Sequence, residues 1–384
     1  MHFQNLTPFA AQHYSGYDAS DRRYDIVVLK TGYWLVPVAD TPGLFTPELI
    51  EDDSIPLCAG DEHEGDPSTT SIVTESDFVP YKPRCDALLV GSAHCPYAQG
   101  ARQWDTRLRF GCLDRFLPNP PVPPAAEQAH DALAWTSYRQ RMRDCQDARH
   151  ACVSNPPWAQ LAIDKTLRVT GPRQFKVGLL ASNAGEAQRT VRVPLRWELA
   201  YGGSCRVDDP DRPDKPLINA VCFQNPLGCG WQVRGTRQAQ AQAHEPIPEY
   251  LPAPQLMYPD ERIEQLDIDS PPPANLDAKA MAKMTYAHRP ANYGPLGKAW
   301  APRLALAGTY DATWEAERHP YLPKDFNMAY WNGAPADQQI DYPVFYNQPL
   351  AVELCGLVRH SHALGGRLLC PLPAHRAIVF AYAD

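Results

Sequence analysis

The stretch WDTRLRFGCL, at residues 104–113, alternates apolar and charged side chains along its middle. Arg109 separates Leu108 from Phe110, and Arg107 precedes them. Because successive side chains of a strand point to opposite faces, this alternation predicts a strand with one buried and one solvated face.

Comparable strand-like runs recur along the chain, with turn residues between them. They lie at residues 24–37, 85–94, 165–171, 173–180, 189–203, 351–357 and 377–383. This spacing predicts a mainly β fold, with an antiparallel sandwich or open-barrel-like sheets joined by long irregular loops. Proline accounts for 40 of the 384 residues. Since proline interrupts helices, long helices should be few.

One segment departs from the β pattern. Within residues 123–153, Trp135, Tyr138, Met142 and Cys145 recur at helical spacing, and prolines flank the segment. This arrangement predicts one inserted amphipathic helix of about 25 residues. We expect its apolar stripe to pack on the chain's own sheet rather than on a partner helix.

The same patterns divide the chain into three regions. Residues 1–117 form an N-terminal β region, and 118–160 hold a proline linker plus the helical insertion. Residues 161–384 form a C-terminal β region with a long aromatic loop block, and this division is compatible with packing as one domain. Residues 234–255 shift from Ala and Gln to spaced prolines, which predicts a linker or a long loop.

The charge and the cysteine content limit which partners and which cellular compartment we expect. Asp and Glu number 44 against 36 Lys and Arg, giving a formal net charge of −8. This balance disfavours nucleic acid and an anionic membrane surface as partners. The 11 cysteines are scattered without a C-x-x-C pair, which predicts reduced thiols. With no secretory pattern at the start and no apolar stretch near membrane-spanning length, we expect a cytoplasmic protein.

The sequence contains no set of residues with the spacing of a known catalytic motif. The sequence has no P-loop, no H-E-x-x-H and no G-x-S-x-G. The acidic run DEHEGD at 61–66 is better explained as a turn than as a metal site, because Gly65 and Pro67 punctuate it. We therefore predict no catalytic residue, no metal and no cofactor, and expect a protein without enzymatic activity.

The densest group of aromatic residues lies at 308–339, in the stretch GTYDATWEAERHPYLPKDFNMAYWNGAPADQQ. Loops of this length are usually anchored or functional. The aromatic side chains predicted to anchor it, each beside a turn signal, are Tyr310, Trp314 and Phe326. The carboxylates predicted to cap its turns are Asp311, Asp325 and Asp337. Arg303 and Arg318 are expected to pair with carboxylates or to stack on aromatic rings.

Some residues of this block are also candidates for contact with a partner. Trp, Tyr and Arg dominate the energetics of protein interfaces. In an extended segment neighbouring side chains face opposite ways, so one of Tyr330 and Trp331 should point outward. The partner-binding candidates are Trp331, Arg318, Tyr330 and Tyr321.

Several blocks, in order, resemble one bacterial domain-of-unknown-function family that is associated with type VI secretion. They include VVLKTGYWL (27–35), VPLRWELAYGG (193–203), NPLGCGW (225–231) and the long block at 293–339. The resemblance implies a cytoplasmic adaptor or chaperone that binds a toxic effector, often with a PAAR-type tip, and helps load it onto the VgrG spike. The helix at 123–153 departs from the family pattern. The alternative is a carbohydrate-binding or carbohydrate-active β protein that uses its aromatic residues as sugar platforms.

Overall fold

The computed structural model describes residues 3–37, 44–50, 55–113, 121–125, 131–154, 158–177, 183–209, 217–273, 275–341 and 350–357. Strand accounts for 34% of the structure and helix for 16%. The strands form several separate sheets, and no closed barrel is present among the described residues. The predicted mainly β, antiparallel fold is therefore confirmed.

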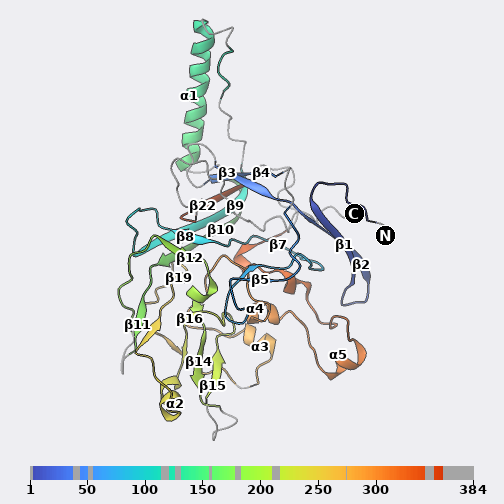
Figure 1. The fold of residues 1–384 in the computed structure, drawn as a ribbon, viewed down its shortest axis with the longest axis vertical. Coiled ribbons are helices and arrows are strands. Elements are labelled where there is room, and N and C mark those ends of the chain that lie inside the picture. The colour runs from blue at the N-terminus through green and yellow to red at the C-terminus, as the bar shows by residue number, and fades with distance from the viewer. Residues whose placement is uncertain are drawn as a thin grey trace.

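The largest sheet has six strands, and every neighbouring pair in it is antiparallel. In spatial order the strands are β19 (Leu256–Met257), β10 (Trp158–Thr170), β9 (Gln103–Leu113), β22 (Leu350–Cys355), β4 (Leu44–Leu49) and β3 (Tyr33–Pro37). Figure 1 shows this sheet across the upper part of the molecular body, with the shorter ladders beside and below it.

The centre of this sheet follows the alternation of residues 104–113. In β9, Trp104 and Leu108 face the core, while Arg107 and Arg109 lie on the other face. There Arg107 binds Asp164 of β10 through two hydrogen bonds of 2.6 Å. Cross-strand ion pairs of this kind keep the solvated face polar, so the one-sided strand prediction is confirmed.

The remaining strands form two-stranded ladders. The antiparallel ladders are β1 (Ala10–Tyr17) with β2 (Arg23–Lys30), β5 (Glu62–His63) with β6 (Ile72–Thr74), β7 (Cys85–Asp86) with β21 (Gln339–Ile340), β8 (Ser92–His94) with β12 (Arg192–Pro194), β11 (Gln174–Lys176) with β18 (Tyr250–Pro252), and β14 (Ser204–Val207) with β15 (Ile218–Val221). The parallel ladders are β13 (Tyr201–Gly202) with β16 (Cys229–Gly230) and β17 (Gln232–Val233) with β20 (Ile268–Asp269).

Three predicted strands are interrupted, and the first of them, residues 24–37, forms β2 and β3, which belong to different sheets. Residues 189–203 form β12, the 3-10 helix η2 (Trp197–Leu199) and β13 instead of one strand. Trp197 is buried in this turn, and its indole nitrogen donates to the carbonyl of Pro295 at 2.8 Å. Residues 85–94 likewise form only β7 and β8. The predicted strand at 377–383 lies outside the described residues.

Among the described residues the helices are short, apart from one. They are α1 (Ala132–Ser154), α2 (Thr236–Gln242), α3 (Ala278–Ala282), α4 (Ala301–Leu304), α5 (Ala312–Glu317), η3 (Met328–Trp331) and η4 (Ala336–Gln338). The composition of residues 234–255 predicted a linker or a long loop. The structure instead has α2 and β18 there, so this prediction is wrong for those elements. Both elements are stabilised by packing and pairing with distant strands that composition does not reveal.

The inserted helix α1 stands away from the body of the molecule (Figure 1). Of the predicted stripe, Trp135, Tyr138 and Met142 are only half-buried and Cys145 is buried, while Leu133 beside the stripe is 81% exposed. Trp135 and Tyr138 contact each other edge to face at 5.7 Å. The helix was correctly predicted, but the expectation that its stripe packs on the chain's own sheet is wrong, because the helix projects beyond that sheet.

The main hydrophobic core lies on the large sheet and draws side chains from Leu35 to Leu357. A second cluster, which includes Phe175, Tyr201 and Trp231, lies among the shorter ladders. The large sheet combines strands from both predicted β regions, and the boundary drawn between residues 160 and 161 falls inside β10. The two predicted β regions thus share one core.

Candidate functional site

The aromatic block at 308–339 consists of short elements joined by capped turns. Asp311 caps α5 by accepting a hydrogen bond from the backbone nitrogen of Trp314 at 2.9 Å. Asp325 accepts from the backbone nitrogen and the hydroxyl of Thr309, both at 2.9 Å. These hydrogen bonds hold the pKa of the Asp325 carboxyl below its usual value. They close the ends of the segment that carries α5.

Asp337 differs from these capping residues. Its carboxylate accepts from the ammonium group of Lys165 at 3.0 Å and from the hydroxyl of Tyr258 at 3.3 Å. Lys165 lies on β10 and is buried, and this burial lowers the pKa of its ammonium group to about 8, although Asp337 opposes the shift. Asp337 was predicted to cap a turn. It instead connects η4 to the large sheet through Lys165.

Below the block lies a group of four buried charges: Glu75, Lys82, Asp86 and Arg303. Arg303 donates to Glu75 at 2.5 Å, and Lys82 donates to Asp86 at 2.6 Å. The expected carboxylate pairing of Arg303 is thus present, and its guanidinium also lies 5.5 Å from the centre of the Tyr330 ring. Two acids and two bases neutralise one another, which limits the cost of burying them.

The end of the aromatic block is attached to this charged group. The side chain of Asn332 and the backbone nitrogen of Gly333 both donate to Asp86, each at 2.9 Å. A β-carbon at Gly333 would lie 1.9 Å from a carboxylate oxygen of Glu75. Any larger residue would therefore displace the buried Glu75 carboxylate. The close approach fixes how η3 lies over the buried charges.

The predicted anchors lie at different depths. Phe326 is buried and contacts the rings of Tyr330 and Trp331. Trp314 is half-buried, and its indole nitrogen donates to the carbonyl of Tyr321 at 2.8 Å. Tyr310 is 53% exposed and touches Trp314 edge to face. Tyr310 is therefore a surface residue and not a buried anchor.

The residues predicted to contact a partner also differ in burial. Arg318 is buried and donates to both carboxylate oxygens of Asp21 at 2.7 Å, so it is not an exposed contact. Tyr330 and Trp331 are both half-buried and touch each other, because they lie in the 3-10 helix η3 and not in an extended segment. Tyr321 is exposed.

Arg318 joins α5 to the β1–β2 hairpin, and aromatic side chains gather beside that junction. Tyr321 meets Tyr17 of β1 edge to face, with ring centres 5.5 Å apart. We call the group formed by the exposed Tyr17, Tyr310 and Tyr321 and the half-buried Trp314 the tyrosine surface. Figure 1 places α5 and the β1–β2 hairpin along the same side of the molecule.

Sequence reasoning missed the contribution of the hairpin. Tyr17 and Asp21 lie about 300 residues from their partners, as the separation of 297 between Asp21 and Arg318 shows. No local pattern marks them. Lys82 and Asp86 carry a weak signal, since their four-residue spacing resembles a helical ion pair, but they lie in no helix here.

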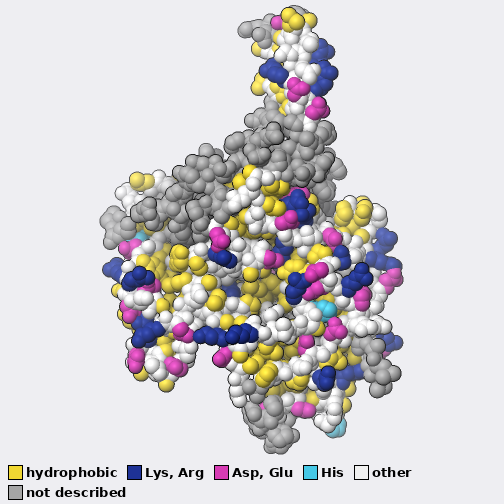
Figure 2. All heavy atoms as spheres, turned by 180° about the vertical axis from the view of Figure 1, so that it is seen from behind, with side chains coloured by type: hydrophobic (Ala, Val, Ile, Leu, Met, Phe, Trp, Pro, Cys, Tyr) yellow, Lys and Arg dark blue, Asp and Glu magenta, His cyan; other side chains and the backbone are white. Residues whose placement is uncertain are grey.

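On the face seen from behind, the charged side chains of the body are mixed in sign (Figure 2). In this view acidic, basic and apolar side chains are interspersed over the body (Figure 2). Among the described residues, no three His, Cys, Asp or Glu side chains lie close enough together to hold a metal ion. In the same part of the chain, no helix has the length and apolar character that a membrane crossing requires.

Comparison with known proteins places this chain in a bacterial family. The family is described as "Uncharacterized protein conserved in bacteria (DUF2169)", and it matches residues 23–118 and 154–384. The match covers most of the chain, so the protein belongs to this family. The unmatched stretch at 119–153 contains nearly all of α1. Searches of curated proteins and of solved structures found no match.

Proposed function

We propose that this protein is a non-catalytic cytoplasmic adaptor that binds a type VI secretion effector and helps load it onto a VgrG–PAAR spike. The pathway rests on the ordered resemblance of the sequence blocks. The tyrosine surface is the observation that supports a binding role. It offers several large, partly exposed aromatic side chains on one side of the molecule.

The way this surface is supported suits a binding role. Asp311 caps α5, Trp314 holds the chain at Tyr321, and Arg318 ties the segment to the hairpin. A platform fixed before binding loses little conformational freedom when a partner docks. Tyr and Trp supply large contact areas with few rotatable bonds, and they are enriched among the residues that dominate interface energies.

Co-purification with the products of the neighbouring genes, among which the proposal places the effector, tests the proposal. We expect the wild-type protein to retain the effector, and Tyr310→Ala and Tyr321→Ala to weaken retention by roughly thirtyfold, which corresponds to ~2 kcal/mol. Tyr97→Ala is the matched control, because Tyr97 is 57% exposed but lies outside the tyrosine surface. All variants should keep the wild-type melting temperature.

The same proteins distinguish the second candidate function, carbohydrate binding. Exposed aromatic rings are what that function would use as well. If the wild-type protein retains no neighbouring effector but binds sugars saturably on a glycan array, the adaptor proposal fails. If Tyr310→Ala and Tyr321→Ala bind effector as well as Tyr97→Ala does, the effector binds elsewhere and the tyrosine surface is scaffold.

A further inference from the structure

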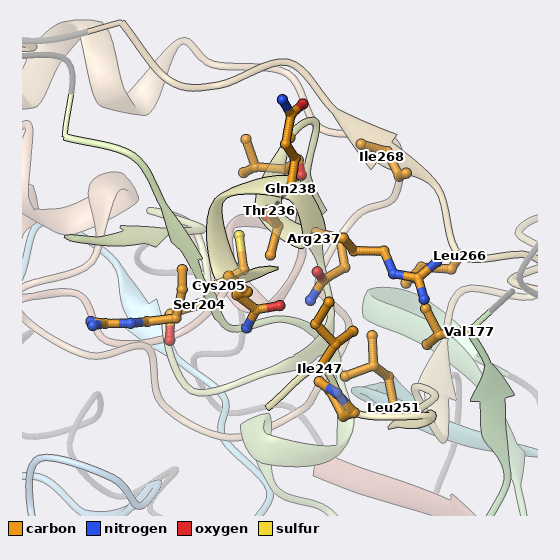
Figure 3. A pocket seen from close by; sticks show the side chains of 16 residues that line it. Val177, Ser204, Cys205, Thr236, Arg237, Gln238, Ile247, Leu251, Leu266 and Ile268 are labelled. Carbon is orange, nitrogen blue, oxygen red and sulfur yellow. Dashed lines mark hydrogen bonds between the residues drawn. The ribbon is translucent and has the colours of Figure 1, made fainter. Parts of the chain in front are cut away.

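Two surface features lie outside the aromatic block: a pocket among the shorter ladders and an edge of the β1–β2 hairpin. The pocket, of about 500 Å³, is lined by α2, β14, β17, β20 and the segment around residues 247–251 (Figure 3). Both arginines that line it are engaged, since Arg206 pairs with Glu245 and Arg237 also has a partner. The described lining therefore has no free charge that would select a ligand. The hairpin edge has a more definite chemistry.

The pairing of the two hairpin strands shows which backbone groups of β1 face away from β2. The backbone nitrogen of Asp18 donates to the carbonyl of Arg22 at 3.1 Å, so these residues form a hydrogen-bonded pair. Hydrogen-bonded and non-hydrogen-bonded pairs alternate along an antiparallel ladder. From this pair the register continues without a bulge to the start of β1. The residues of β1 whose N–H and C=O groups point outward are therefore Ala11, His13, Ser15 and Tyr17.

These outward groups are unpaired within the part of the chain that the structure describes. β1 has β2 as its one strand neighbour there, and no backbone hydrogen bond from another described segment reaches the outward groups. Phe3 stacks on the ring of His13 at 5.9 Å, so the N-terminal segment contacts the strand through side chains and adds no ladder to it. An unpaired edge of eight residues is a template for another strand.

The two edges of the hairpin differ in their protection against pairing. Natural edge strands are commonly protected by charged side chains, by proline or by a bulge. On β2 the outward positions include Arg23 and Asp25, and both are exposed. The β1 sequence AAQHYSGY contains no proline, lysine, arginine or acidic residue, and its ladder with β2 has no bulge. The edge that is open to pairing is therefore that of β1.

The side chains beside this edge define what an added strand would contact. On the face toward the body, Tyr14 is half-buried, donates to the Val79 carbonyl at 2.8 Å and has its ring centre 5.9 Å from that of Phe78. His13 and Ser15 lie on the other face of the hairpin. Side chains of adjacent strands on one face contact each other. An added strand would therefore place apolar side chains beside Tyr14 and polar ones beside His13 and Ser15.

The β1 edge leads to the tyrosine surface. Tyr17 is the last residue of β1, and its ring meets that of Tyr321. Beyond Tyr17, Arg318 holds the hairpin turn through Asp21 and the Ala19 carbonyl. A segment paired with β1 would therefore reach the aromatic rings without changing its extended conformation.

We propose that the outward edge of β1 binds an extended segment of the effector as an added strand. This inference rests on the proposed function, which supplies the partner, while the hairpin supplies the mode of binding. Main-chain hydrogen bonds to β1 give affinity, and alternating apolar and polar side chains give the segment its specificity. The segment has no proline at the positions that donate to β1, and it ends on the tyrosine surface.

Amide hydrogen exchange at single-residue resolution, on the full chain alone and with the co-purified effector, tests this proposal. In the free protein the outward amides of β1 should exchange freely, and the effector should slow them by about tenfold or more. The amides of Asp25 and Val27, which face outward on β2, are the internal control and should not change. Outward β1 amides that are already protected in the free protein, or that the effector leaves unprotected, overturn the proposal.

Two proline variants with matched controls locate the edge through retention of the effector. Ala11→Pro and His13→Pro each remove an outward N–H of β1, whereas Leu29→Pro and Val27→Pro remove the outward N–H directly opposite on β2. Proline is tolerated at such edge positions, because no ladder hydrogen bond is lost. The β1 variants should weaken retention about tenfold, since the acceptor on the effector is left unpaired. The β2 variants should retain the effector as wild type.

The outcomes separate this inference from the proposed function. If the wild type retains the effector and the β1 variants retain it equally well, the added strand is excluded while the adaptor function stands. If the wild type retains no effector, both fail. If the β1 amides become protected as the concentration of the chain alone rises, the edge pairs with a second copy, which overturns the effector as its occupant. Variants that do not fold leave the exchange measurement on the wild type to decide.

Discussion

Arg318 has a structural role that its residue type alone does not reveal. Arginine is common at protein interfaces, but here the guanidinium faces Asp21 and the carbonyl of Leu322. The residue is only 9% exposed. Its side chain therefore supports the tyrosine surface from below and is not part of it.

We predict that Arg318→Ala destabilises the fold. The change leaves the Leu322 carbonyl and one side of Asp21 without their donor, which should reduce the free energy of unfolding by about 1–3 kcal/mol. Asp21 is partly exposed, so the loss should be below that of a fully buried pair. Urea unfolding measures the effect.

Arg22→Ala is the control for this measurement. Arg22 forms an ion pair with Asp18 in the same hairpin, but its side chain is 81% exposed. Such exposed pairs contribute little to stability. Equal stability of the two variants would show that the Arg318–Asp21 pair does not hold α5 to the hairpin.

Among the secondary-structure elements, the sequence predicted those whose formation depends on local periodicity. The alternation of 104–113 predicted β9, and the helical spacing of Trp135 and Tyr138 predicted α1. Residues 189–203 were mispredicted as one strand, because the burial of Trp197 beside Trp300 favours a 3-10 turn. In the candidate site, the roles of Asp311 and Asp325 at turns followed from the sequence. The role of Asp337, the exposure of Tyr310 and the burial of Arg318 did not, because they depend on contacts between distant segments.

The insertion that contains α1 should be dispensable for folding. It connects β9 to β10, which are antiparallel neighbours with Leu113 opposite Trp158. Chain ends placed this way can be joined by a short loop. Replacing residues 119–153 by Asn-Gly should leave the melting temperature within a few degrees of wild type, since each halving of loop length changes the closure free energy by only about 0.6 kcal/mol.

Circular dichroism and thermal unfolding of the shortened protein test this prediction. The helical signal should fall, while the β signal and the cooperative transition remain. A shortened protein that does not fold would mean that α1 contributes to the core. If it folds but no longer retains the effector, the insertion takes part in choosing the partner.

At the scale of the whole molecule, many short elements share cores that contain buried ionisable groups. Burial raises the pKa of the thiols of Cys85, Cys222, Cys229 and Cys355 from 9.0 to about 12. Each cysteine with a described side chain is a free thiol. The stability of the fold should therefore depend on pH in the alkaline range.

The direction of this pH dependence follows from the number of protons that the folded and unfolded states bind. Between pH 9 and 12 an unfolded thiol loses its proton while the folded thiol keeps it, so folding is favoured below pH 9 and that stability is lost as pH rises. Lys165 acts in the opposite direction, because its folded pKa of about 8 lies below its ordinary 10.5, so its contribution rises between those values. Four thiols outweigh one lysine, and we predict a net loss of stability above pH 9.

Urea unfolding in reducing buffer from pH 8 to 11 checks this prediction with two opposed variants. Each titrating group changes the slope by at most about 1.4 kcal/mol per pH unit. Cys229→Ala removes one buried thiol, so its stability should fall less steeply with pH than that of the wild type. Lys165→Met removes the opposing group, so its stability should fall more steeply. Parallel curves for all three proteins would show that these buried groups do not control alkaline stability, because their protons would then be lost equally in the folded and unfolded chains.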